Sequence, residues 1–286
     1  AIEKLIQVIL NSKIISFNFL TDNLSPIDTN IIGISFCIDA NENYYLPIRY
    51  KEKIKNNFSD NDLIFILNKL KNIFENEKIL KVTHNSKYYS VVLKKYKIQL
   101  KGLFFDTMIA SHLLNPSTRS NTLDSVSLEY LNFELISIDE LIGVGRKKIK
   151  MEMVELEKLS MFSCQDVNLI FKLYIILEKK LIESGLNGYL KNIEIPLIEV
   201  LADMEFFGVF VDKNILKKMS NRINIILDNL KEKIYSFSNQ DFNINSTQQL
   251  AKILFDDIGL PQIKKRSTAE EVLKQLSFQH ELPDYI

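Results

Sequence analysis

The first hundred residues contain short apolar runs that are bounded by polar, turn-forming residues. Three of these runs are rich in β-branched and aromatic side chains and lie close together, at residues 14–19, 30–38 and 44–48. Such runs predict strands, and the short distances between them favour an antiparallel meander. The pattern then changes, because apolar residues recur every three or four positions within residues 62–74, which predicts an amphipathic helix.

Beyond this helix, short apolar runs alternate with segments of helical period. Strands are predicted at residues 79–82 and 103–105, and helices at 87–96 and 107–114. Strands that alternate with helices usually pair in parallel. The whole order, three strands followed by three helices that alternate with two further strands, predicts an α/β domain with a mixed five-stranded sheet of the ribonuclease-H-like type.

The rest of the chain is predicted to be almost entirely helical. A long helix over residues 156–183 is apolar on one face, and Gly185 and Gly188 follow it. Because glycine is unfavourable inside helices, we predict a domain boundary here. The two domains then cover residues 1–187 and 188–286.

The second domain shows a series of helix start and stop signals. A helix over residues 192–207 is stopped by Gly208, and Asp212 is expected to cap the next helix. That next helix carries an apolar seam that predicts a partner helix. The seam comprises Ile215, Met219, Ile223, Ile226, Leu230 and Ile234. Two shorter helices are expected to begin with capping boxes at Ser246 and Ser267.

Composition excludes several classes of protein. The chain has 286 residues, of which 46% are hydrophobic and 25% charged, so it can bury cores. Its formal net charge is zero, so any affinity for nucleic acid must come from local patches. Two cysteines and three scattered histidines offer neither a disulfide framework nor a zinc motif. We expect a cytoplasmic protein, because there is no signal-peptide pattern and no apolar run of about 18 residues.

Several short strings occur in a fixed order and at characteristic distances. They are FDTM at 105–108, NIEIPL at 192–197, FGV at 207–209, FNINS at 242–246, ILF at 253–255 and STAEEVL at 267–273. With this ordered set the chain resembles a family A DNA polymerase of the bacterial DNA polymerase I type, over essentially its whole length.

The resemblance implies a function for each domain. The first would be the 3′→5′ exonuclease domain, and the second would be the beginning of the polymerase thumb. The palm and fingers would lie beyond Ile286, so the chain would be a fragment that does not polymerise DNA alone. The parent enzyme would perform template-directed DNA synthesis with Mg²⁺ in replication and repair, and we expect no cofactor in the fragment itself.

The exonucleases of this family hold two metal ions with four carboxylates, and a Tyr or His orients the attacking water. Asn18 and Leu20 stand where the family has Asp and Glu on the first strand. Tyr89 replaces the Asp of the second motif, and Phe162 replaces the tyrosine of the third. Of the four carboxylates, Asp166 alone remains.

We therefore interpret the exonuclease site as vestigial, with no intact catalytic residue and no metal. One carboxylate cannot hold two divalent ions against their hydration, and Tyr89 and Leu20 are expected to fill the space of the ions. A competing hypothesis is an active 3′→5′ exonuclease with a relocated site built from Asp22, Asp106 and Asp166. An N-cap role already explains Asp106.

Three basic stretches are candidates for DNA contact. Residues 78–105 hold seven lysines and no acid, which predicts either a solvated positive face or a backbone contact. Residues 145–150 (GRKKIK) predict a basic surface loop. In the thumb, the resemblance implies contacts with the DNA backbone. The thumb candidates are Asn243, Ser246, Lys264, Lys265, Arg266 and Ser267.

The expected partners are primer–template DNA, bound weakly by the fragment alone, and the remaining polymerase domain of the same chain. We expect a monomer with no membrane contact. A third hypothesis is a non-catalytic helical module whose seam, within residues 212–235, binds another protein.

Overall fold

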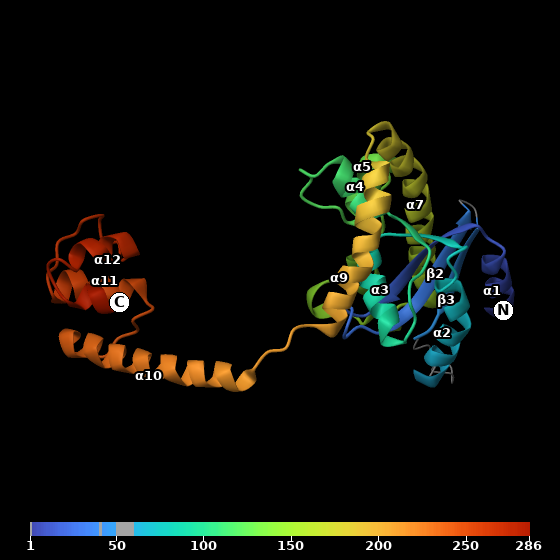
Figure 1. Ribbon diagram of the computed structural model, residues 1–286. Coiled ribbons are helices and arrows are strands. Elements are labelled where there is room, and N and C mark those ends of the chain that lie inside the picture. Colours follow the sequence, from blue (N-terminus) through green and yellow to red (C-terminus); the bar gives the residue numbers. More distant parts are fainter. Residues whose placement is uncertain (1, 40–41, 50–59) are drawn as a thin grey trace. The chain divides into compact units, whose positions relative to one another are not determined.

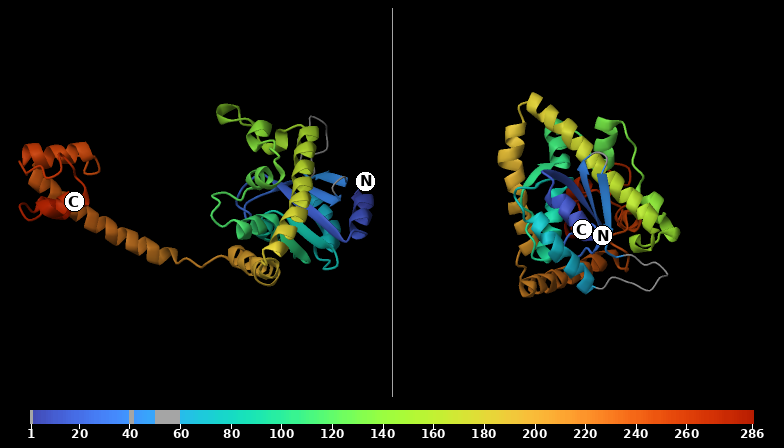
Figure 2. Two further views of the ribbon diagram at one scale, coloured as in Figure 1. Left: turned by 90° about the horizontal axis from the view of Figure 1, so that it is seen from above. Right: turned by 90° about the vertical axis from the view of Figure 1, so that its right-hand side faces the viewer.

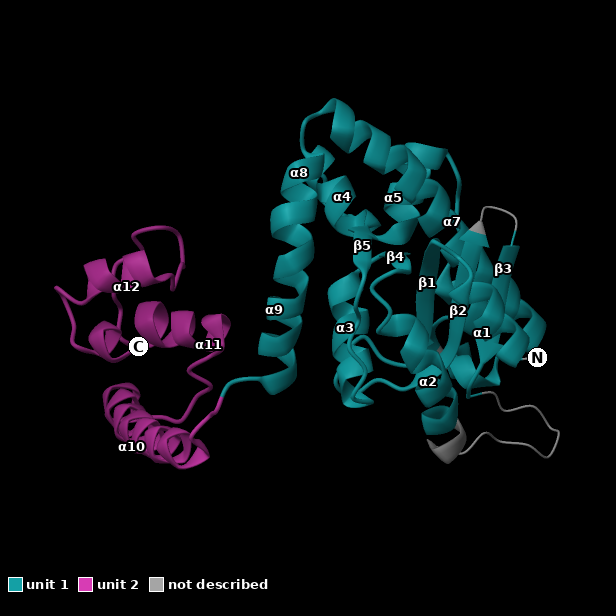
Figure 3. Cartoon of the chain, turned by 45° about the vertical axis from the view of Figure 1, so that its right-hand side comes forward, with its two compact units in different colours: residues 1–209 teal, residues 210–286 magenta. Residues whose placement is uncertain are grey.

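The computed structural model describes residues 2–39, 42–49 and 60–286. The chain divides into two compact units, Ala1–Val209 and Phe210–Ile286 (Figure 3). This division lies beyond the domain boundary expected at 187/188, because the helix that ends at Phe207 packs against the first unit.

The first unit is built on a mixed five-stranded sheet in the order β3-β2-β1-β4-β5 (Figure 1). The strands are β1 (Ile14–Thr21), β2 (Ile31–Asp39), β3 (Glu42–Pro47), β4 (Leu80–Thr83) and β5 (Leu103–Asp106). The meander β1–β2–β3 is antiparallel, whereas β4 pairs in parallel with β1 and with β5. The predicted α/β class and sheet type are therefore confirmed.

One face of the sheet carries an aromatic core. Phe17 and Phe19 alternate along β1 and meet Phe74, with ring centroids 5.4 and 5.7 Å away. Burial of each such side chain contributes roughly 1.5–3 kcal/mol. The helices on this side are α1 (Ile2–Leu10), α2 (Asp60–Phe74) and α3 (Ser86–Lys95). We did not predict α1, although its apolar residues have a helical period and its Ile9 is fully buried.

The opposite face is covered by the long helix α7 (Leu156–Glu183), which crosses the strands (Figure 2). By length and composition alone, α7 could cross a membrane, but half of its most apolar window is buried inside the protein. It is anchored to the sheet by Ser16, whose Oγ donates to the carbonyl of Val167 at 2.7 Å. The helices beside it are α4 (Thr107–Leu114), α5 (Leu123–Leu131) and α6 (Ile138–Ile142).

The first unit ends with α8 (Asn187–Tyr189), a π-helical turn at Leu190–Glu194 and α9 (Ile195–Phe207). Gly208, at φ 66°, stops α9 as predicted. Two ion pairs join α9 to α3: Lys94 Nζ lies 2.6 Å from Asp203 Oδ1, and Lys87 pairs with Glu205.

The second unit contains α10 (Lys213–Ser238), α11 (Thr247–Lys252) and α12 (Glu270–Leu276). The predicted cap at Asp212 is confirmed, since its side chain accepts hydrogen bonds from the first turn of α10. Ser246 caps α11 by accepting from the N–H of Gln249. The predicted capping box is incomplete, because the Gln249 side chain accepts from the N–H of Asn243 instead of that of Ser246. The predicted start at Ser267 is wrong. Ala269 has extended backbone angles and takes the N-cap position of α12, so the helix cannot begin earlier.

Candidate functional site

The five predicted exonuclease positions come together where β1, α3 and α7 meet. Asn18 and Leu20 alternate on β1 and therefore point to the same face of the sheet. Phe162 and Asp166 lie one helical turn apart on α7, and Tyr89 comes from α3. Three strings far apart in the sequence thus build one site.

Two hydrogen bonds connect the polar members of this group. Asn18 Nδ2 donates to Asp166 Oδ2 at 3.0 Å, and the Tyr89 hydroxyl donates to Asn18 Oδ1. All three side chains are buried, with exposed fractions between 7% and 9%. The amide of Asn18 therefore uses both of its ends.

Asp166 is poorly satisfied for a buried carboxyl group. Its Oδ1 is buried and has no hydrogen-bond partner among the described residues. Burial raises the pKa of Asp166 to about 7, although the hydrogen bond from Asn18 opposes this shift. Near neutral pH the group is therefore divided between its protonated and ionised forms.

An apolar cluster closes the other side of the site. It is called the Leu20 cluster here and comprises Leu20, Ile32, Ile142, Met151, Val154, Leu159 and Phe162. The sequence predicted Leu20 and Phe162 at the site but not the other five members. Their contribution could not be found from a motif, because they are ordinary core residues that converge only in the fold.

This set of groups does not fit a pair of divalent ions. Hard cations need several oxygen ligands, whereas the site offers one carboxylate, one amide and one phenol against apolar side chains. Within residues 2–39, 42–49 and 60–286, no three His, Cys, Asp or Glu side chains lie close enough together to hold a metal ion.

The other two carboxylates of the relocated-site hypothesis have separate structural roles. Asp22 accepts hydrogen bonds from the backbone and side chain of Asn30, at 2.7 and 2.8 Å. Asp106 is fully buried and caps α4 by accepting from the backbone N–H of Met108 and Ile109, as predicted. It also accepts from the backbone N–H groups of Asn85 and Ser86 and from the Ser86 hydroxyl.

Part of the positive charge of the lysine-rich segment 78–105 is engaged within the first unit. Lys87 and Lys94 pair with acids of α9, Lys101 lies 3.4 Å from Glu77, and Lys81 is fully buried. The sequence predicted a solvated face or a DNA contact. It missed the ion pairs of Lys87 and Lys94 because their partners on α9 lie more than a hundred residues away.

The candidate DNA contacts of the second unit are also engaged internally. Arg266 binds Asp256 through two hydrogen bonds of 2.7 Å, and Lys264 Nζ lies 3.1 Å from Glu271. Lys265 stands between them at φ 50° without an ion-pair partner in the described chain.

The three polar candidates stabilise their own turns. Asn243 Oδ1 accepts from the backbone N–H of Asn245, and Asn243 N donates to Gln249 Oε1. Ser246 Oγ accepts from the N–H of Gln249, and Ser267 Oγ accepts from that of Ala269.

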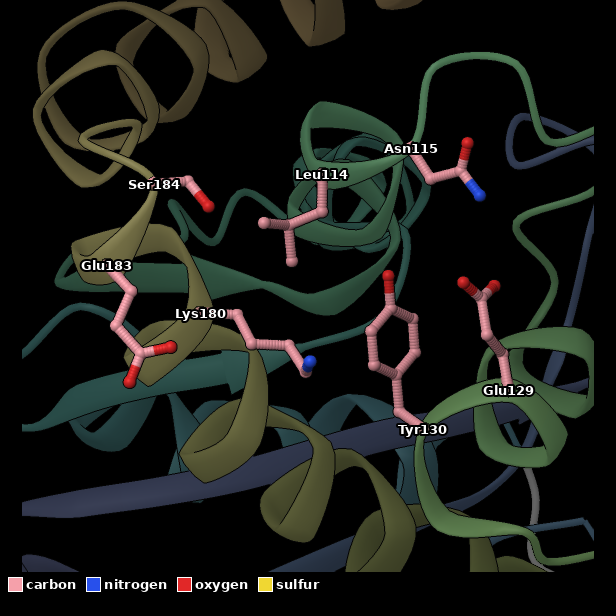
Figure 4. A pocket seen from close by; sticks show the side chains of 7 residues that line it. All are labelled: Leu114, Asn115, Glu129, Tyr130, Lys180, Glu183 and Ser184. Carbon is pink, nitrogen blue, oxygen red and sulfur yellow. The ribbon is translucent and has the colours of Figure 1, made fainter.

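Two pockets of the first unit lie away from these groups. One, of about 390 Å³, is lined by mainly polar side chains and by Leu114, near the ends of α4, α5 and α7 (Figure 4). In it, Lys180 extends toward the ring of Tyr130, with 5.7 Å from Nζ to the ring centroid. The other, of about 480 Å³, lies between α3, α9 and residues 99–103. Neither pocket includes Asp166 in its lining.

Family models match both units. The model described as DNA polymerase I, ribonuclease H-like domain, matches residues 30–173, and that of DNA polymerase family A matches residues 213–286. A solved structure, the POL domain of Pol1 from M. smegmatis in complex with DNA primer-template and dNTP, has a similar fold. The TM-score is 0.72 at 19% identity, over 99% of this chain and 45% of that one.

Curated relatives give the same result at the level of sequence. DNA polymerase I of Pseudomonas aeruginosa is 31% identical over 96% of this chain, and that of Borreliella burgdorferi is 32% identical over 98%. The chain spans 31% and 30% of the lengths of these two relatives. By motif, fold and similarity, the chain belongs to the DNA polymerase I family, within family A of the DNA polymerases.

Proposed function

We propose that this chain is part of a DNA polymerase I that performs template-directed DNA synthesis with Mg²⁺, as a monomer in the cytoplasm. The first unit is a structural scaffold without proofreading activity, and the second begins the thumb that holds primer–template DNA. The names of the relatives support the polymerase role. The observation that carries the scaffold role is the replacement of metal ligands by the Tyr89–Asn18–Asp166 hydrogen bonds and the Leu20 cluster.

The outer face of α9 supports the scaffold role independently. Its apolar side chains recur at helical spacing and are exposed by 40–81%. They are Leu197, Val200, Leu201, Met204 and Phe207. The other face of α9 is fixed to α3 by ion pairs. A contiguous exposed apolar stripe on a fixed helix is typical of an interface, and we assign it to the remaining polymerase domain of the same chain.

A second candidate function is favoured by α10. Four members of its predicted seam are exposed in the second unit, from Ile226 at 48% to Ile215 at 56%. Leu230 is half-buried and Ile234 is buried. A non-catalytic helical module that binds another protein would show the same exposure. We prefer an intramolecular partner, because the family A model covers this helix.

The proposal is tested with a 5′-labelled DNA strand. Residues 1–286 with Mg²⁺ or Mn²⁺ should neither shorten a single strand nor extend a primer, whereas the complete natural protein should extend the primer. Asp166→Asn is the matched control for the nuclease assay, since it removes the remaining carboxylate. Shortening that is present in the parent chain and lost in Asp166→Asn would overturn the scaffold role. Failure of the complete protein to extend a primer would overturn the polymerase role.

A further inference from the structure

A compact basic loop projects from the first unit between α6 and α7. It is called the Lys147 loop here and comprises residues 143–150. The N–H of Ile149 donates to the carbonyl of Ile142 at 2.8 Å, which closes the neck of the loop. Gly143 turns the chain at φ 78°, and a Cβ there would lie 3.1 Å from the carbonyl oxygen of Lys147. The loop therefore has a defined hydrogen-bonded shape that depends on a glycine.

Both ends of the loop are fixed beside the former metal positions. Ile142 precedes it and Met151 follows it, and both are at least 91% buried because their exposed fractions are 7% and 9%. Both side chains belong to the Leu20 cluster, together with Leu20 and Phe162. The cluster that closes the vestigial site thus also anchors the loop.

The lysines of the loop differ from those of segment 78–105. Lys147, Lys148 and Lys150 are all exposed, and none has an ion-pair partner in the part of the chain that the structure describes. By contrast, Lys87 and Lys94 are bound to acids of α9. The loop therefore presents positive charge that the protein leaves uncompensated.

The surroundings of the loop favour a narrow anionic partner. Asp139 and Glu140 precede it in the sequence, and Glu152 and Glu155 follow it. A flat anionic membrane would approach these acids as well as the lysines, whereas a single row of phosphates can contact the loop alone. The loop also lacks aromatic side chains, on which bases stack.

We propose that the Lys147 loop is a DNA-binding site, in which Lys147, Lys148 and Lys150 contact the phosphate backbone without reading sequence. The inference rests on the proposed function for the choice of DNA as the polyanion. Single-stranded and duplex DNA share this chemistry, and separate binding measurements distinguish them.

The experiment compares two triple variants of residues 1–286. The first is Lys147→Gln/Lys148→Gln/Lys150→Gln. The matched control removes the same charge from exposed positions of α7, as Lys158→Gln/Lys172→Gln/Lys179→Gln. Binding to a labelled single strand and to a duplex is measured by fluorescence anisotropy from 50 to 200 mM salt.

Loss of three phosphate contacts should make the slope of log K against log salt shallower by up to about 2.7 for duplex DNA or about 2.1 for a single strand. The control variant should keep the parent slope. The partner is the form of DNA whose change in slope comes closer to its own maximum.

Three results would overturn the inference: no binding of either DNA by the parent chain, an unchanged slope in the loop variant, or equal weakening by both variants. Loop-dependent binding of phosphatidylserine vesicles without any effect on DNA would replace DNA with a membrane as the partner. None of these results bears on the nuclease and primer-extension assays, so failure here leaves the proposed function intact.

Discussion

Two buried aspartates of the first unit show opposite ways of placing a carboxylate inside a protein. Asp106 is fully buried and accepts five hydrogen bonds, from four backbone N–H groups and one hydroxyl. Asp166 is 7% exposed and accepts one, while its second oxygen has no partner in the described chain. Both residues match motifs of the family, but one stabilises the fold and the other is a cost to it.

The difference in hydrogen bonding distinguishes a buried carboxylate that stabilises the fold from one that destabilises it. Buried polar groups are normally hydrogen-bonded, and each exception needs an explanation. The surroundings of Asp106 satisfy it because two helices begin there. Asp166 receives one hydrogen bond, from Asn18, and its other neighbours Tyr89 and Leu20 donate nothing to it.

The largest effect should come from Asp106→Ala. It leaves the first turns of α3 and α4 without their shared acceptor, so the free energy of unfolding of the first unit should fall by roughly 3–5 kcal/mol. Urea titration followed by circular dichroism measures the loss. Asp212→Ala, which removes an exposed cap of α10, is the comparator and should cost only about 1 kcal/mol. Equal losses of stability in the two variants would show that Asp106 contributes no more than an ordinary exposed helix cap.

Asp166→Asn should increase the free energy of unfolding, in contrast to Asp106→Ala. The pKa of Asp166 is raised from 3.8 to about 7 in the folded protein, so the folded state binds more protons than the unfolded state between about pH 4 and pH 7. Stability from this group is full at low pH and is lost as the pH rises through that window. The variant should therefore be more stable than the parent by about 2–4 kcal/mol at pH 8.

The control for this prediction is the same pair of proteins at pH 4, where their stabilities should nearly coincide. Chemical denaturation at both pH values measures the difference. A variant that is less stable than the parent at pH 8 would show that the ionised carboxylate of Asp166 is stabilised by its surroundings. Asp166 would then not differ from Asp106 in the way that we describe.

Tyr89→Phe should have the smallest effect. It removes the donor to Asn18 Oδ1 but keeps the aromatic contacts with Phe17 and Phe19. The expected loss is about 1 kcal/mol, typical of one hydrogen bond. Tyr88→Phe, which alters a more exposed hydroxyl, should cost less. Thermal denaturation measures both losses. A larger loss for Tyr88→Phe than for Tyr89→Phe would show that the exposed hydroxyl of Tyr88 contributes more to stability than the buried hydroxyl of Tyr89.

Much of this fold could be predicted from the sequence because the signals are local. Apolar runs of strand length gave the meander, and helix caps such as Asp212 and Gly208 marked helix ends. Helix α1 was not predicted, although its apolar residues have a helical period. The helix start predicted at Ser267 was wrong, because a capping pattern does not reveal the extended backbone of Ala269.

The candidate site was only half predictable for a different reason. Motif spacing located Asn18, Tyr89 and Asp166, since these positions follow the family pattern. It could not show the unpaired oxygen of Asp166, nor that Lys94 would bind Asp203. Both depend on which side chains meet across the fold, and sequence distance carries no information about that.

Under the proposed scaffold role, the Leu20 cluster also makes the loss of metal ligands hard to reverse. A single change such as Leu20→Glu would bury a second carboxylate beside Asp166 without a partner, at a cost of several kcal/mol. Proteins are stable by only about 5–15 kcal/mol, so such an intermediate would lie close to unfolding. Several ligands would have to return together, because each single change would destabilise the fold. The apolar cluster therefore disfavours a stepwise return of a metal site.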